Sequence, residues 1–254
     1  MNVNQNPSRL DLSSTPAPAP AIPQVKARGR GVGSNASGRF EAFRRSGFDD
    51  GWHREDDDLP VLRTHVTEEA ARSIIARNVS PDISFDRSIN PYRGCEHGCS
   101  YCYARPSHAY LGLSAGLDFE SRLFAKTNAV ELLHKELGAK GYEPATIALG
   151  ANTDPYQPVE RQYRLTREIL KVLNKCNHPV GIVTKSALVT RDIDILKPMA
   201  EKGLVKVALS ITTLDYKLSR QMEPRASAPG KRLQAIEILS ASGIPTVAMT
   251  APII

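Results

Sequence analysis

The sequence lacks any apolar run of the roughly 18 or more residues that a membrane-spanning helix needs, so we expect no transmembrane segment. Its N-terminus, Met1-Asn2-Val3-Asn4-Gln5-Asn6-Pro7, has neither the basic start nor the apolar centre of a secretory signal peptide. Cysteine is scarce as well, with four in 254 residues, and nothing suggests the disulfide framework of a secreted domain. We therefore expect a cytoplasmic protein that has no membrane partner.

Three of the four cysteines lie within one short segment and are separated by three and then two residues: Cys95, Cys99 and Cys102. Tyr101 stands directly before the last of them. Thiolates are soft ligands that favour iron–sulfur clusters, zinc or Cu(I). Gly94 and Gly98 would let the segment fold tightly around a metal, because glycine tolerates backbone angles that other residues avoid. The spacing therefore predicts a metal-binding loop.

The number of cysteines leaves two kinds of metal site open. A cubane cluster held by three thiolates leaves one iron without a protein ligand. A closed zinc site needs four ligands, and His97 could supply the fourth. The remaining cysteine, Cys176, lies in a helical pattern, where we expect it to be a small buried apolar residue.

Residues 1–60 read as a low-complexity tail with no periodic pattern. A Pro/Ala run at 13–23 is followed by a basic stretch and then by an acidic one. We expect this tail to be disordered, because it has too little apolar surface to fold. Two alternatives remain. The basic stretch could bind nucleic acid, or aromatic residues could anchor the tail to the core: Phe40, Phe43 and Phe48.

After the tail we expect a helical lead-in at 61–81 and a core at 82–254. Thr67 can cap a helix, and two acidic residues follow it directly. This pattern predicts a helix over 67–78. The core alternates short apolar strands with amphipathic helices. We expect strands at 82–89, 145–150, 180–184, 205–210 and 246–250, and helices at 128–140, 166–176, 191–202 (capped by Thr190) and 231–240. This alternation is typical of a parallel α/β sheet. No phosphate-binding glycine loop follows any strand, which argues against a Rossmann nucleotide site.

Small polar residues follow the expected strands at the end where parallel α/β folds carry their chemistry. They are Asn152, Thr153 and Asp154 after the second strand, Lys185 and Ser186 after the third, and Ser210 and Thr212 at the end of the fourth. Each segment alone could be an ordinary helix cap. Together with the cysteine loop after the first strand, they predict a site on one rim of the sheet.

The run from Cys95 to Arg105, Cys-Glu-His-Gly-Cys-Ser-Tyr-Cys-Tyr-Ala-Arg, resembles the cluster loop of the radical S-adenosylmethionine (SAM) enzymes. It is most similar to the branch that contains spore photoproduct lyase and its DNA repair photolyase-like relatives. The resemblance extends from about residue 82 to the end of the chain. It implies a partial (β/α)6 TIM-like barrel, here apparently truncated after the fifth strand, because the sequence stops at Ile254.

The resemblance also implies two cofactors, a 4Fe–4S cluster and SAM. Cys95, Cys99 and Cys102 would ligate three irons, and SAM would chelate the fourth. Ten further residues would lie around SAM: Tyr101, Tyr103, Asn152, Thr153, Asp154, Lys185, Ser186, Ser210, Thr212 and Arg225. The tyrosines would flank the adenine and the cluster, and Asn152 to Asp154 would meet the methionine amino group. Lys185 or Arg225 would pair with the carboxylate, and Ser210 and Thr212 would bind the ribose.

The implied reaction is reductive cleavage of SAM to a 5′-deoxyadenosyl radical, which abstracts hydrogen from an unidentified substrate. Nucleic acid is a candidate substrate, since the chain is mildly basic, with a net charge of +6. The electron donor would be a flavodoxin or a ferredoxin. Spore photoproduct lyase uses a further cysteine as hydrogen donor, but this chain has none between Tyr103 and Lys175, so we do not expect that route. The competing interpretation is a non-enzymatic protein that binds zinc or nucleic acid through the loop and tail.

Overall fold

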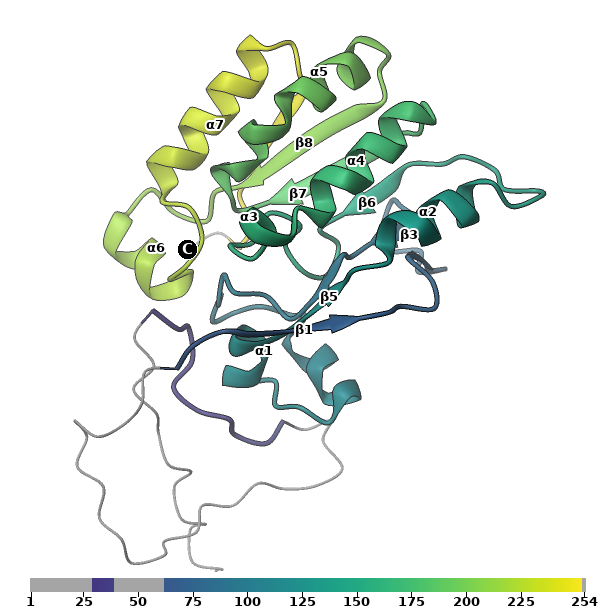
Figure 1. The fold of residues 1–254 in the computed structure, drawn as a ribbon. Coiled ribbons are helices and arrows are strands. Elements are labelled where there is room, and N and C mark those ends of the chain that lie inside the picture. The colour runs from purple at the N-terminus through teal and green to yellow at the C-terminus, as the bar shows by residue number, and fades with distance from the viewer. Residues whose placement is uncertain (1–28, 39–61, 253–254) are drawn as a thin grey trace, which may run out of the picture.

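A six-stranded sheet in the order β2-β3-β6-β7-β8-β9 forms the centre of the fold (Figure 1). The structure is a computed structural model that describes residues 29–38 and 62–252. β2 pairs antiparallel with β3, and every later pairing in this sheet is parallel. The strands are β2 (Ile75–Arg77), β3 (Arg87–Ile89), β6 (Ile147–Leu149), β7 (Val180–Thr184), β8 (Val205–Ser210) and β9 (Thr246–Met249).

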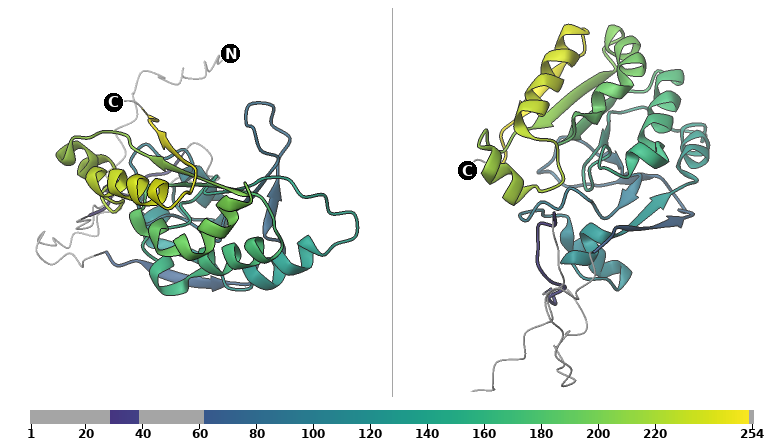
Figure 2. Two further views of the ribbon diagram at one scale, coloured as in Figure 1. Left: turned by 90° about the horizontal axis from the view of Figure 1, so that it is seen from above. Right: turned by 60° about the vertical axis from the view of Figure 1, so that its left-hand side comes forward.

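Over the described residues this sheet stays open, with β2 and β9 at its edges, as in a partial barrel. The helices between its strands lie along one side of it (Figure 2). They are α2 (Ala129–Leu137), α4 (Leu165–Lys175), α5 (Ile193–Glu201) and α7 (Pro229–Ala241). Two short helices, α3 (Glu160–Tyr163) and α6 (Tyr216–Met222), and the 3₁₀ turn η3 (Ala187–Asp192) lie in the connections between these elements. The five parallel strands and the partial barrel predicted from the sequence are confirmed.

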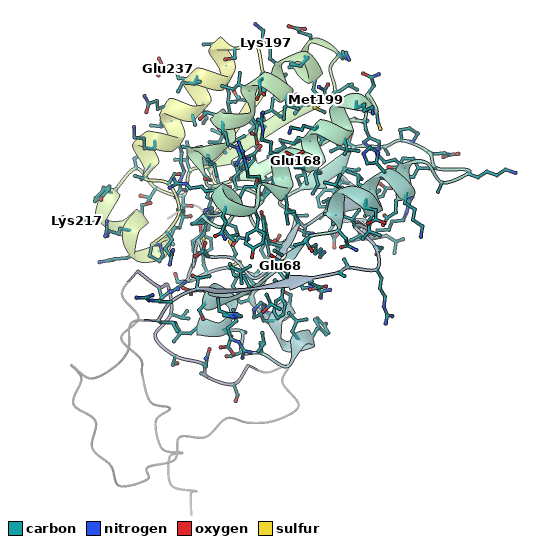
Figure 3. The ribbon with its side chains drawn as sticks, viewed as in Figure 1. Glu68, Glu168, Lys197, Met199, Lys217 and Glu237 are labelled. Atoms are coloured by element: carbon teal, nitrogen blue, oxygen red, sulfur yellow. The ribbon has the colours of Figure 1, made fainter. Side chains whose placement is uncertain are left out.

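The main core lies between the sheet and these helices. Ile147, Leu149, Val207 and Leu209 on the strands are fully buried, because a parallel sheet hides its apolar residues under its crossover helices. The helices show the matching amphipathic pattern. On α5, Met199 is buried, whereas Lys197 projects from the outer surface (Figure 3). The hydrophobic periodicity of the sequence therefore predicts correctly which of these side chains are buried.

A second, three-stranded sheet has the order β1-β5-β4 and lies beside the first (Figure 1). Its strands are β1 (His65–Glu69), β4 (Tyr92–Arg93) and β5 (Arg122–Lys126), and η2 (Arg105–Leu111) and α1 (Leu117–Ser121) precede β5. β5 runs parallel to β1 and antiparallel to β4. The cysteine segment lies between β4 and η2 in the chain, so its N-terminal end is attached to this smaller sheet.

The helix predicted over 67–78 is wrong, because this stretch forms β1 and β2. The prediction used local signals, a threonine cap and two acids, whereas the partners of this stretch are distant in sequence. β1 pairs with β5 over five residue pairs. The backbone amides of Ile74 and Ile75 donate to the Glu136 carboxylate at 2.7 and 3.0 Å. These amides are therefore not available for the hydrogen bonds of a helix. Tertiary contacts thus override a weak local propensity.

The helix predicted over 191–202 exists, but Thr190 does not cap it. α5 begins at Ile193 after η3, and Ser186 is the residue whose side chain accepts the amide of Leu188, at the start of η3. Thr190 instead donates to the carbonyl of Ala187 at 2.9 Å.

Among the described residues, no helix is long and apolar enough to span a membrane.

Candidate metal centre

The cysteine loop is tightly folded, as the sequence predicted. Gly94 and Gly98 both have positive φ, at +75° and +65°. A Cβ at Gly94 would lie 2.6 Å from a methyl carbon of Leu123, and one at Gly98 would lie 2.6 Å from a carboxylate oxygen of Glu120. Both the backbone angles and the close packing therefore require glycine. Cys95 and Cys99 are buried, at 8% and 9% exposure, and Cys102 is half-buried.

A buried ion pair supports the loop from the side of the smaller sheet. Arg105 donates from Nε and Nη2 to the carbonyl of Cys99 at 3.0 and 2.9 Å. The same guanidinium pairs with Glu120, which is fully buried at the end of α1. Because a buried charge is costly unless it is paired and hydrogen-bonded, Arg105 and Glu120 depend on each other. Through Arg105 they fix the backbone of Cys99.

A strap formed by residues 29–38 lies against the same loop. The amide of Gly31 donates to Glu120 at 2.9 Å, and Arg30 donates to the carbonyl of Glu120 at 2.6 Å. Further along the strap, Asn35 and Asp118 exchange two hydrogen bonds of 3.0 and 2.9 Å. The sequence contained no signal for these contacts, because the strap falls inside the predicted low-complexity tail. Residues 1–28 and 39–60 of that tail, with Phe40, Phe43 and Phe48, lie outside the described residues.

Burial keeps two of the loop thiols in their neutral form. It raises the pKa of the Cys95 thiol well above its usual range, with Asp154 and Cys99 adding to the effect. It also raises the pKa of Cys99 to about 12, although Lys185 acts in the opposite direction. A metal changes this balance, since coordination removes the thiol proton and supplies the missing positive charge. An all-thiol donor set fits an iron–sulfur cluster.

Asp154 connects the loop to the ends of β6 and β7. One carboxylate oxygen lies 3.3 Å from His97 Nδ1 and accepts the amide of Lys185 at 2.7 Å. The other accepts the hydroxyl of Thr184 at 2.7 Å and the amide of Tyr156 at 2.8 Å. Burial alone would raise the pKa of Asp154, but His97 and these hydrogen bonds lower it to about 2. Asp154 is therefore an ionised anchor whose oxygens already have several donors.

Tyr101 begins a second network, whose carboxylate and guanidinium are buried. Its hydroxyl donates to Glu223 and lies 3.1 Å from the Thr212 hydroxyl, which donates to the same carboxylate at 2.7 Å. Arg232 pairs with Glu223 and donates to the carbonyl of Ser210 at 2.8 Å. Burial alone would raise the pKa of Glu223, but Arg232 and these bonds lower it. The network joins the loop to the end of β8 and to α7.

The structure brings together four of the predicted SAM-contacting residues. Lys185 Nζ lies 5.7 Å from the centre of the Tyr101 ring, and Tyr101 contacts Thr212. Ser210 is buried directly before this point at the end of β8. The ends of β7 and β8 therefore meet the cysteine loop at one rim, as a parallel sheet requires.

The other predicted residues have separate contacts. Tyr103 is exposed and its hydroxyl donates to the carbonyl of Ala151. Thr153 is buried and donates to the carbonyl of Tyr92 at 2.8 Å, and the amide of Asn152 donates to the Asn90 side chain at 3.0 Å. Ser186 is buried at the start of η3. Arg225 forms an ion pair with Glu96 in the loop, with 3.0 Å between Nη2 and Oε1.

Sequence reasoning missed the charged residues that hold the loop in place: Glu96, Arg105, Glu120, Glu223 and Arg232. Their ion-pair partners lie 9 to 129 residues away in the chain. No local pattern marks a carboxylate that will be buried against a distant arginine. Cys176 was also assigned wrongly, because it is exposed at the C-terminal end of α4 rather than buried.

The zinc interpretation gains no fourth ligand from this geometry. Within residues 29–38 and 62–252, no three His, Cys, Asp or Glu side chains converge as a ready-made metal site. His97, the proposed fourth ligand, directs Nδ1 to Asp154 and is 2% exposed. The loop supplies three thiols whose sulfur atoms would come together around the group that they bind.

Comparison with known proteins gives an independent result. The sequence model of the Radical SAM superfamily matches residues 89–254. An uncharacterised protein of Mycobacterium tuberculosis is 38% identical over 172 residues, which cover 68% of this chain and 51% of that protein. An uncharacterised protein of Methanocaldococcus jannaschii is 34% identical over 166 residues, or 65% of this chain and 60% of that protein. The chain thus spans about half the length of the mycobacterial relative.

Solved structures of spore photoproduct lyase share the fold. A mutant of that enzyme with bound AdoMet and dinucleoside spore photoproduct superposes with a TM-score of 0.53 at 18% identity. The match covers 74% of this chain and 51% of the lyase chain. A second mutant, with the dinucleoside spore photoproduct, gives a TM-score of 0.52 at 20% identity. At this identity the likeness establishes the fold alone.

Proposed function

Because the chain belongs to the radical SAM superfamily, we propose that it binds a 4Fe–4S cluster and SAM and cleaves SAM reductively. The observation that carries this proposal is the loop of Cys95, Cys99 and Cys102, which lies within the matched range and directly follows β3 and β4. Three buried or half-buried thiols suit a cluster that keeps one iron open.

When bound, the reduced cluster would supply one electron to SAM and so yield methionine and a 5′-deoxyadenosyl radical that abstracts hydrogen from the substrate. The protein's own contribution is position, charge and exclusion of water. The Arg105–Glu120 pair holds the backbone of Cys99. The Asp154–His97 contact holds the loop against the ends of β6 and β7.

The proposed SAM contacts are the residues that gather on the rim: Tyr101, Lys185, Ser210 and Thr212. Lys185 is half-buried, and its ammonium can pair with the SAM carboxylate in a charge-assisted hydrogen bond. Burial raises the pKa of Tyr101, so the hydroxyl stays protonated and continues to donate to Glu223. This fixes the aromatic ring that would lie beside the adenine.

For the substrate we propose a nucleic acid, and for the chemistry a lyase-type reaction. The net charge of +6 supports this, as does the dinucleoside ligand of the similarly folded lyase. A thiol hydrogen donor does not form part of the proposal, since the fourth cysteine, Cys176, is exposed at the end of α4. The reducing partner would be a cytoplasmic flavodoxin or ferredoxin.

Metal analysis tests the cluster. Protein purified without oxygen should be brown and contain about four iron and four sulfide per chain, the content of one cubane. Colourless protein with a single zinc would instead support the non-enzymatic interpretation.

A further inference from the structure

A polar pocket of about 240 Å³ lies beside the cysteine loop, and the proposed function so far gives it no role. It is smaller than the roughly 300–1,000 Å³ of pockets that enclose a whole small ligand. Its volume suits one group of a larger molecule. Eight of its nine lining residues carry hydrogen-bonding or charged side chains: Asn90, Tyr92, Arg93, Ser107, His108, Tyr110, Lys126 and Asn152.

The pocket adjoins the loop from both ends. Arg93 lies two residues before Cys95, and Ser107 lies five residues after Cys102. Asn152, which follows β6, closes the pocket against the end of β3, where its amide donates to the Asn90 side chain at 3.0 Å. The pocket therefore lies next to the segment that carries the cysteines.

The lining is rich in donors and cations. Of the described residues around the pocket, two are cationic, Arg93 and Lys126, and none is acidic. Arg93 already pairs with Glu69 through Nη2, with 2.8 Å between the two atoms. Because a guanidinium carries five N–H donors, Arg93 keeps others for a ligand.

Lys126 has no such partner. In the part of the chain that the structure describes, its ammonium makes no hydrogen bond or ion pair, although the residue is half-buried. Two acids act on it electrostatically, Glu69 on the neighbouring strand β1 and Glu136, and each has another hydrogen-bond partner. Glu69 is held by Arg93, and Glu136 accepts the amides of Ile74 and Ile75. Burial lowers the pKa of Lys126, and Arg93 lowers it further. A partly desolvated ammonium that makes no direct ion pair is costly, and an anion in the pocket would relieve that cost.

Tyr110 adds an aromatic surface at the mouth of the pocket. Its side chain is 92% exposed, on the turn η2 that follows the loop. An exposed ring beside two cations can pack against a planar group that is attached to an anion.

We propose that this pocket is a substrate subsite that binds an anionic oxygen group, a phosphate or a carboxylate, with Lys126 as its main charge partner. Arg93, Asn90 and Ser107 supply further donors, and Tyr110 packs against the part of the substrate outside the pocket. This inference rests on the proposed function only in assigning the anion to the substrate of the cysteine-loop reaction.

Calorimetric titration of the reconstituted protein with inorganic phosphate and, separately, with acetate tests the subsite. We expect saturable binding of at least one anion, and the stronger binder identifies the group. Lys126→Met should weaken that binding at least about tenfold, as for the loss of a charge-assisted hydrogen bond. Lys140→Met, an exposed lysine beyond α2, should leave it unchanged. Ser107→Ala, which keeps both cations, should weaken it less and guards against misfolding of the first variant.

Three results would overturn the subsite: no saturable binding of either anion, equal binding by wild type and Lys126→Met, or competition between the anion and SAM for one site. SAM cleavage is measured in the same wild-type preparation. Cleavage without anion binding rejects the subsite alone, whereas anion binding without cleavage rejects the proposed reaction.

Discussion

Gly31 of the strap approaches Gly98 of the cysteine loop so closely that a Cβ on Gly31 would lie 1.6 Å from the carbonyl oxygen of Gly98. Both residues also contact Glu120, which accepts the amide of Gly31 and lies against Gly98. The backbone of the strap therefore packs directly on the backbone of the loop. A residue 64 positions before the first cysteine thus shapes the candidate cluster site.

The first prediction is that Gly31→Ala displaces the loop. Because the nearest atoms belong to backbone, neither side can move cheaply, and overpacking of this kind costs about 1–3 kcal/mol of folding stability. We expect less iron per chain after reconstitution, measured together with the thermal unfolding midpoint. Gly230→Ala is the matched control, since nothing lies within 4 Å of the added carbon. Equal iron content in both variants would show that the strap does not support the loop.

The second prediction concerns Lys185 and SAM. Lys185→Met removes the ammonium near Tyr101 but keeps the backbone amide that donates to Asp154. We expect the cluster to assemble normally and SAM to bind more weakly by roughly 1–3 kcal/mol, as for a lost charged hydrogen bond. Equilibrium binding of SAM to the reconstituted protein measures the change. Lys197→Met, on the outer surface of α5, should bind SAM as the wild type does (Figure 3). If the two variants bind SAM equally, Lys185 does not contact the cofactor.

The third prediction concerns the buried pair of Arg232 and Glu223. Within the described part of the chain, Arg232→Met leaves the Glu223 carboxylate with two hydroxyl partners, Tyr101 and Thr212. Removing one member of a buried ion pair typically costs about 3–5 kcal/mol. Urea unfolding should show a loss of this size. Arg220→Met, an exposed arginine on α6, should change the unfolding free energy little. Similar small losses in both variants would contradict the buried network.

The fourth prediction is a pH dependence of stability from His178. Its Nδ1 bonds the carbonyl of Pro179 at 3.0 Å, and Nε2 lies 2.7 Å from the Tyr142 hydroxyl, so the neutral ring suits both partners. Burial lowers the pKa of His178 below its ordinary value of about 6.5. As the pH falls below about 6.5, the unfolded chain therefore binds more protons than the folded protein. The stability that neutral His178 contributes is complete above about pH 6.5 and is lost as the pH falls through the folded pKa.

Comparison of urea unfolding at several pH values checks this sign. His178→Gln should reduce the slope of the unfolding free energy below pH 6.5, by up to about 1.4 kcal/mol per pH unit for one proton. His134→Gln, at an exposed position of α2, should retain the wild-type slope. A slope unaffected by His178→Gln would show that this histidine titrates normally.

The sequence predicted the repeating part of the fold well. Val180–Thr184 and Val205–Ser210 form β7 and β8 with the predicted bounds, because short apolar runs between amphipathic helices have few other ways to bury themselves. The cysteine loop could also be located from the sequence, because its three cysteines lie within eight consecutive residues, Cys95 to Cys102.

The smaller sheet and the supports of the loop were not predictable in the same way. β1 depends on pairing with β5, more than fifty residues later, and local cap signals pointed to a helix instead. The pairs Arg105–Glu120 and Arg232–Glu223 look like ordinary surface charges until the fold buries them. The sequence placed polar residues at the strand ends, but it could not separate Asp154, an internal anchor, from Lys185, whose ammonium lies near the Tyr101 ring.

Quantification of 5′-deoxyadenosine after reduction of the reconstituted protein with SAM tests the central claim most directly. The account predicts that the wild type forms 5′-deoxyadenosine and methionine in equal amounts. Cys102→Ser should lose both the brown colour and the product, because it removes one of three cluster ligands. Cys176→Ser, at an exposed position outside the loop, should retain both. Wild-type protein that holds a full cluster and binds SAM, yet forms no 5′-deoxyadenosine on reduction, would contradict the proposed reaction.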